Sequence, residues 1–235
     1  MKKIVLIFNL LFSTQIFSAD LQCLKSYKTF KNIQEESINV IKNGTDDEMK
    51  AFNDRYSYSI LFKKNHPGQS YFNGNWIDEN VAKLSSSIMA SSFRNGEIEV
   101  VNYTISEPKA NFMSNIGEVC VVPMQSTIIY YFDEKGTTNA DFLFIRDLNN
   151  NQWRFFPYYG SEKKEDFNEF FPDFPKSVKL SPSSTTYESG NDLTSIDYAK
   201  SLFKKMGMDI PPEVLNDLQE KQEETKLRKK MNGFN

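Results

Sequence analysis

Residues 118–160 contain three runs of β-branched and aromatic positions, separated by two short segments of turn-forming residues. The runs cover residues 126–132, 141–147 and 153–159. β-Branched and aromatic side chains suit a pleated, half-buried surface. The intervening residues 133–136 and 149–151 are rich in Asp, Gly and Asn, which tolerate turn geometry. The pattern predicts an antiparallel meander against which the rest of the chain packs.

Both faces of this meander are apolar. A turn tip at residues 149–150 places Phe144 opposite Phe155, and the same register places Arg146 opposite Trp153. Period-two alternation then assigns residues to faces. One face carries Phe142, Phe144, Trp153 and Phe155, and the other carries Leu143, Ile145 and Phe156. A sheet with one solvated face alternates apolar with polar residues, so we expect a cover on each side. The N-terminal helices would cover one face, and the C-terminal segment, a second subunit or a ligand would cover the other.

Three segments before the meander show apolar residues at helical spacing. They span residues 24–41, 49–56 and 78–93. The second follows a capping-box pattern, in which the Thr45 hydroxyl accepts from the backbone of Glu48 and the Glu48 side chain reaches back. In the third segment, one stripe carries Ile77, Val81, Leu84 and Ile88. We expect amphipathic helices whose stripes face the sheet.

Strand-like patterns also occur at residues 57–62, 71–72, 97–106 and 116–124. The turn residues His66-Pro67-Gly68 separate the first two, which would form a hairpin; the competing interpretation extends the second helix to Phe62. Pro123 marks a bulge, a bend or an edge position in the last strand. Together with the meander, these patterns predict an α+β fold with helices packed on a curved antiparallel sheet.

The chain changes character after Gly160. Four phenylalanines, punctuated by Pro172 and Pro175, form an aromatic strip that could cover the second sheet face: Phe167, Phe170, Phe171 and Phe174. Residues 181–191 are rich in Ser, Thr, Pro and Gly, which is typical of a linker. Two further helices are predicted at residues 193–203 and 213–230, the last of them mostly charged. The chain thus divides into residues 1–19, 20–160, 161–191 and 192–235.

The first 19 residues resemble a secretory signal. Lys2 and Lys3 precede an apolar run at residues 4–12, and Ser18-Ala19 offer small residues for cleavage before Asp20. The apolar run is too short to span a bilayer. We therefore expect export to a bacterial periplasm or the outside, with an uncleaved N-terminal anchor as the alternative. The bacterial assignment rests on the signal and on the Lys, Asn and Phe usage.

Charge and cysteine content agree with export. The formal net charge is −3, and a mildly acidic chain has no field that attracts nucleic acid or anionic lipid. The two cysteines, Cys23 and Cys120, both follow the signal. A lone pair in an oxidising compartment usually forms a disulfide, which would join the first helix to the sheet. A redox-active pair is disfavoured because the chain has no Cys-x-x-Cys motif.

Residues for catalysis or metal binding are few. His66 is the single histidine, so a multi-histidine metal site is excluded and we expect no metal or cofactor. The chain has no Gly-x-Ser-x-Gly element and no Gly-rich phosphate loop. Asp141 begins a strand among aromatic residues, where burial would raise its pKa and make it a candidate base. The alternative is an ordinary turn-flanking Asp.

The order of elements is similar to the NTF2-like (cystatin-like cone) fold. The segments that carry the resemblance are the helices at residues 24–41, 49–56 and 81–93, and the strand with Gln152-Trp153-Arg154-Phe155. The resemblance covers residues 21–160 and implies a sheet curled around helices to form a conical pocket. Some members of the family are enzymes and many only bind or scaffold, and several exported bacterial members are partner-binding or immunity-type proteins. A catalytic Asp/Tyr set of the isomerase members does not map onto this chain.

These observations favour an exported, non-catalytic binding module. It would act through a protein partner or an apolar ligand in a cone whose candidate lining is Tyr103, Tyr130, Phe142, Phe144, Trp153 and Phe155. One alternative is an envelope-assembly protein that docks through its charged C-terminal helix. Another is an enzyme that uses Asp141 with Tyr130 or Tyr103. A homodimer through the second sheet face is a further expectation.

Overall fold

The computed structural model describes residues 21–130 and 134–188, with individual residues between 196 and 223, and shows an α+β fold. The helices, with η for 3₁₀, are η1 (Leu24–Ser26), α1 (Tyr27–Asn43), α2 (Asp46–Tyr56), η2 (Ser59–Asn65), α3 (Glu79–Arg94) and α4 (Lys164–Phe170). The strands are β1 (Gln69–Phe72), β2 (Asn75–Asp78), β3 (Glu99–Ile105), β4 (Ala110–Ser114), β5 (Gly117–Tyr130), β6 (Glu134–Arg146), β7 (Trp153–Tyr158) and β8 (Ser184–Glu188). The signal predicted at residues 1–19 and most of the helices predicted at 193–203 and 213–230 lie outside the described residues.

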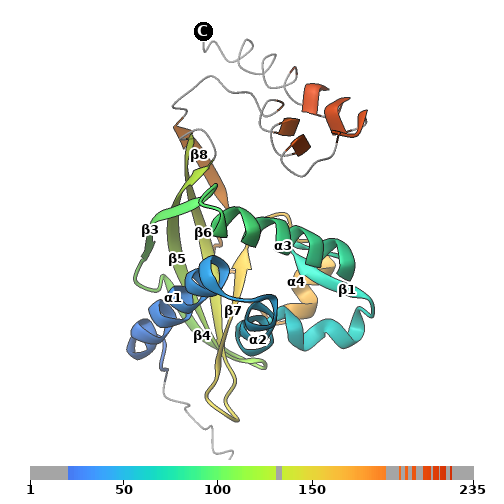
Figure 1. The fold of residues 1–235 in the computed structure, drawn as a ribbon. Helices are drawn as coiled ribbons and strands as arrows, with labels where there is room; N and C mark the ends of the chain where they lie inside the picture. Colours follow the sequence, from blue (N-terminus) through green and yellow to red (C-terminus); the bar gives the residue numbers. More distant parts are fainter. Residues whose placement is uncertain are drawn as a thin grey trace, which may run out of the picture.

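A long hairpin of β5 and β6 forms the centre of a curved, six-stranded antiparallel sheet (Figure 1). Each hairpin strand carries two short strands on its outer edge. On β5, β4 pairs with the first half and β3 with the second. On β6, β8 pairs with the first half and β7 with the second. The β1–β2 hairpin forms a separate two-stranded sheet.

The predicted register of the meander is confirmed. Phe144 pairs with Phe155, and Arg146 pairs with Trp153. The two faces separate as expected, since Phe144 and Trp153 belong to one core cluster and Leu143 belongs to another. In the first cluster these residues pack against α1 and α2, which supply the buried Phe30, Ile33 and Phe52. The capping box that begins α2 is also confirmed, with both Thr45–Glu48 hydrogen bonds present.

The aromatic strip of the chain itself covers the second face. Phe170 is fully buried, and its ring centroid lies 5.0 Å from that of Phe156 on β7. Phe171 is 2% exposed and stacks on Tyr58, at 5.5 Å between ring centroids. Of the three covers expected for this face, the structure shows the C-terminal segment over the half that contains Leu143.

The first helical turn is fixed to the sheet by a disulfide and a buried carboxylate. The predicted bond between Cys23 and Cys120 is present, with 5.7 Å between the two Cα atoms. Next to it, Glu118 is fully buried. One of its oxygens accepts from the backbone amides of Gln22 and Cys23, at 2.7 and 2.9 Å. The other accepts from Arg146 Nε at 2.7 Å. A buried carboxylate is tolerated only when it is paired in this way.

Two local predictions are wrong. Residues 57–62 do not form a strand: after a single bridge from Ser57 to Phe155, the chain enters η2. A helical conformation forms in place of a strand because it lets Tyr58 and Phe62, four residues apart, both pack on the aromatic strip. The linker predicted at residues 181–191 contains β8, whose threonines suit an edge strand.

The apolar stripe predicted for α3 does not face the core. Val81 is 53% exposed and Leu84 is 63% exposed, whereas Ala82 and Ala90 are buried. Small side chains let α3 approach α1 and β1 closely, which explains why the helix turns its alanines inward. The sequence also gives no indication of β4, and it divides β5 at Pro123, although β5 continues through this residue.

Loss of the disulfide should destabilise the domain strongly. The bond joins residues 97 positions apart, and the chain-entropy model assigns about 4–5 kcal/mol to a loop of this length. We expect a reducing agent to lower the free energy of unfolding of the wild type by about this amount, measured as a lower midpoint of urea unfolding. The C23S/C120S double variant is the control: it should start at the reduced value and show no response to the reductant. Equal midpoints for oxidised and reduced wild type would contradict the expectation.

Candidate functional site

Along each outer edge of the central hairpin, one short strand ends and another begins. On the β5 side, β3 ends at Ile105 and β4 begins at Ala110. On the β6 side, β7 ends at Tyr158 and β8 begins at Ser184. Pro123 and Asp141, which pair with each other in the hairpin, lie between these two gaps. The outer edge of β5 lacks a strand partner at Val122 and Pro123, and the outer edge of β6 lacks one at Ala140, so the two gaps lie next to each other in the hairpin.

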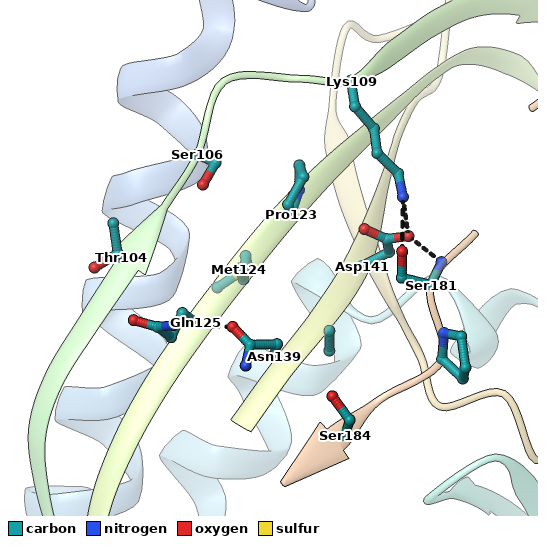
Figure 2. Close-up of a pocket in the computed structure, with 12 residues that line it drawn as sticks. Thr104, Ser106, Lys109, Pro123, Met124, Gln125, Asn139, Asp141, Ser181 and Ser184 are labelled. Atoms are coloured by element: carbon teal, nitrogen blue, oxygen red, sulfur yellow. Dashed lines mark hydrogen bonds and ion pairs between the residues drawn. The ribbon is translucent and has the colours of Figure 1, made fainter. Parts of the chain in front are cut away.

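A pocket of about 390 Å³ lies at this junction (Figure 2). Most of the residues that line it carry a polar side chain, whereas ligand pockets are usually lined mainly by apolar side chains. The residues that line it are Thr104, Ser106, Lys109, Pro123, Met124, Gln125, Asn139, Ala140, Asp141, Ser181, Pro182 and Ser184. They come from both edges of the sheet and from the segment that leads into β8.

Asp141 is the most buried polar residue of the pocket, with 2% of its surface exposed. Its Oδ2 accepts from Lys109 Nζ and from the Ser181 backbone amide, each at 2.5 Å. Lys109 Nζ also donates to Ser181 Oγ at 3.2 Å. No donor among the described residues reaches Asp141 Oδ1. In Figure 2 this oxygen points away from Lys109 and Ser181, toward the side of Pro123.

Beyond Asp141, a row of amide and hydroxyl groups crosses four strands. We name it the amide row; it consists of Thr104 (β3), Gln125 (β5), Asn139 (β6) and Ser184 (β8). All four are exposed. Gln125 Nε2 donates to Asn139 Oδ1 at 2.9 Å, which leaves the Gln125 carbonyl to accept, and one Gln125 and both Asn139 amide hydrogens to donate. The pocket therefore offers donors and acceptors together, as a hydroxyl-rich ligand requires.

Four of the six residues expected to line an apolar cone pack together within the first core cluster. These are Phe142, Phe144, Trp153 and Phe155. Phe30 of α1 fills the space beside them, with its ring centroid 4.1 Å from that of Phe144 and 4.9 Å from that of Trp153. Tyr103 packs against the same cluster, and burial is the main cause that raises its pKa. Tyr130 lies apart from the cluster, with its ring 6.2 Å from that of Tyr187.

The sheet separates Asp141 from the two tyrosines with which it could have formed a catalytic set. Tyr103 pairs with Ser126, an even-numbered residue of β5, so the two side chains share a face of the sheet. Asp141 pairs with Pro123, at an odd position of the same strand. Because successive side chains of a strand point to opposite faces, Asp141 faces away from Tyr103 and from Tyr130.

His66 takes part in a contact between η2 and α4. Its Nε2 lies 2.8 Å from Glu169 Oε2, and its ring stacks on Trp76 at 3.9 Å between centroids. Asn65 donates to the other oxygen of Glu169 at 2.7 Å. Burial alone would raise the pKa of Glu169, but the hydrogen bonds from His66 and Asn65 lower it below its ordinary value. This geometry is that of a structural clamp.

Among the described residues, no cluster of His, Cys, Asp or Glu could hold a metal ion. In the same part of the chain, no helix combines the length and the apolar character needed to cross a bilayer.

Sequence reasoning singled out Asp141 but not its partners. Lys109 and Ser181 are 72 residues apart, and neither belongs to a motif. Pro123 was the one available signal, because a proline within a predicted strand marks a bend or an interrupted edge.

Comparison of the chain with protein-family models, with curated proteins and with solved structures found no match.

The Glu169 clamp should make stability sensitive to acid. The pKa of Glu169 is lower in the folded protein than in the unfolded chain, so its contribution is full above the unfolded value of about 4.3 and is lost as the pH falls through the folded value. We expect Glu169→Gln to lower the urea midpoint at pH 7 and to reduce its decline between about pH 5 and 3. Glu165→Gln, at an exposed position of the same helix, is the matched control. Identical pH profiles for wild type and Glu169→Gln would contradict the expectation.

Proposed function

We propose that this protein is an exported, non-catalytic binding module that holds a small, hydroxyl-rich ligand in the pocket at Asp141. One observation carries the proposal: a carboxylate that is 2% exposed leaves one oxygen without a donor among the described residues, in a pocket of about 390 Å³. Asp141 lines the pocket, so this oxygen can accept a hydrogen bond from a molecule bound there. A ligand hydroxyl would supply the missing donor.

The groups around Asp141 can donate to the oxygen of a ligand hydroxyl, which accepts hydrogen bonds as well as donating one. Lys109 brings a positively charged donor, and its side chain is 31% exposed. The amide row adds further donors and acceptors within the same pocket. Each hydroxyl of a polyol can donate to Asp141 or to the Gln125 carbonyl while it accepts from Lys109 or from an amide. An apolar ligand would leave these groups unpaired.

The arrangement supports binding rather than catalysis. Asp141 faces away from Tyr103 and Tyr130, and His66 is engaged with Glu169 at 2.8 Å. The curved sheet with α1 and α2 packed on one of its faces is compatible with the NTF2-like resemblance. Within that architecture the ligand site shifts from the cone interior, which Phe30 occupies, to the opposite face of the sheet.

A protein partner is the second candidate. It is favoured by α3, on which Val81 and Leu84 are more than half exposed. If this helix carries the function, the V81K/L84K variant and not Asp141→Asn will remove association with the partner.

Export predicts a defined mature terminus. The disulfide fits an oxidising compartment, and small residues precede Asp20. When the full chain is expressed in bacteria with a C-terminal tag, we expect N-terminal sequencing of the periplasmic protein to begin at Asp20. Protein that begins at Met1 and remains with the membrane would contradict cleavage.

Asp141→Asn should weaken ligand binding without unfolding the domain, because the side chain keeps its shape and Lys109 can turn to solvent. We expect at least one active compound in a panel of neutral monosaccharides, sugar alcohols and amino acids to bind the wild type and raise its melting temperature. Hydrogen bonds to a charged group contribute about 1.5–3 kcal/mol, so the variant should bind the active compound about 10- to 100-fold less tightly. Glu99→Gln, at the exposed start of β3, is the control. Equal affinity of wild type and Asp141→Asn would reject the site.

A further inference from the structure

The polar surface does not end at the pocket. A second row runs parallel to the amide row on the same face; we name it the threonine row, and it consists of Asn102 (β3), Thr127 (β5), Thr137 (β6) and Thr186 (β8). These residues are two positions from their neighbours in the amide row along each strand, so both rows share one face. The Thr127 and Thr137 hydroxyl oxygens lie 3.3 Å apart, and Asn102 and Thr186 are exposed.

The two rows form a band that carries no charged side chain. An ion pair stands at each end: Lys109 with Asp141 at 2.5 Å, and Lys135 with Glu188 at 3.1 Å. Asp141 and Lys135 are six residues apart on β6, so the band extends for about 20 Å at about 3.4 Å per residue. The band is therefore longer than the pocket, and it is electrically neutral between its ends.

Several polar groups of this band are available to a ligand. Within the described part of the chain, the side chains of Asn102, Thr104 and Ser184 make no hydrogen bond. The aromatic strip, which covers the other half of this face, packs on residues such as Leu143 and Phe156. The half with the two rows instead presents amides and hydroxyls, a pattern that does not suit lipid or an apolar helix.

We infer that the ligand is a neutral, extended glycan chain, which binds with one sugar unit in the pocket at Asp141 and further units along the amide and threonine rows. This inference rests on the proposed function, because the pocket is one end of the band. A nucleic acid or another polyanion would meet no excess of positive charge here. A neutral glycan brings a hydroxyl or amide to each position where the band offers a donor or an acceptor.

The test is the dependence of affinity on chain length. N-acetylglucosamine and its trimer and hexamer, together with glucose and cellohexaose, are titrated into the full chain by calorimetry. We expect at least one series to bind about tenfold or more tightly as the hexamer than as the monomer, because each added unit makes new hydrogen bonds.

Two variants on β8 separate the band from the pocket. Thr186→Val removes a hydroxyl of the threonine row and should weaken hexamer binding about 3- to 10-fold while leaving monomer binding unchanged. Thr185→Val is the matched control on the opposite face of β8, where Thr185 bonds to Thr138, and it should change neither. Thermal unfolding of both variants is the control for folding, and each should show a cooperative transition.

The outcomes distinguish this inference from the proposed function. If monomer and hexamer bind equally and only Asp141→Asn reduces binding, the extended site is rejected and the pocket stands. The extended site is likewise rejected, and the pocket retained, if a different small polar compound binds in an Asp141-dependent way while no saccharide does. If the wild type binds neither the saccharides nor any compound of the small-molecule panel, both proposals are rejected.

Discussion

A long hairpin with two apolar faces imposes the architecture of this protein. The β5–β6 hairpin presents Phe144 on one side and Leu143 on the other, and neither face can remain in water. The chain covers the first side with α1 and α2, and the second with the aromatic strip together with residues of η2 and the β1–β2 hairpin. Glu118 and the disulfide hold the first cover at its starting point. The helices, the aromatic strip and the anchoring groups all serve the burial of one hairpin.

The polar pocket is a by-product of how the edges of that hairpin are completed. Each edge is paired by two short strands rather than one long strand, and the two changeovers lie next to each other, close to Pro123 and Asp141. Pro123 has no amide hydrogen to donate, while its carbonyl accepts from the Ser106 amide at 2.9 Å. Asp141 pairs with Tyr158 of β7, and its side chain also bonds to two edge segments. Asp141 is thereby held as a buried charged residue of the sheet, as Glu118 and Arg146 are elsewhere in it.

Sequence reasoning succeeded where the signal was local or strongly periodic. The asparagine turn set the pairing of Phe144 with Phe155, Thr45 and Glu48 identified a helix start, and the phenylalanine spacing identified a cover. It failed where packing decides between faces, as on α3. It also missed β8, because an edge strand exposed along its whole length carries no apolar alternation. The pocket escaped it because Lys109, Asp141 and Ser181 are brought together only by tertiary structure.

The sulfur bridge between the first helical turn and β5 sets the order of events when the chain matures. If the protein is exported as proposed and enters an oxidising compartment amino end first, one thiol arrives 97 residues ahead of the other. The early thiol then has no partner within its own molecule until β5 has crossed. Since the chain holds only two cysteines, no incorrect internal pairing exists. Maturation thus requires an oxidant, whereas an enzyme that reshuffles bonds would have nothing to correct within a single chain.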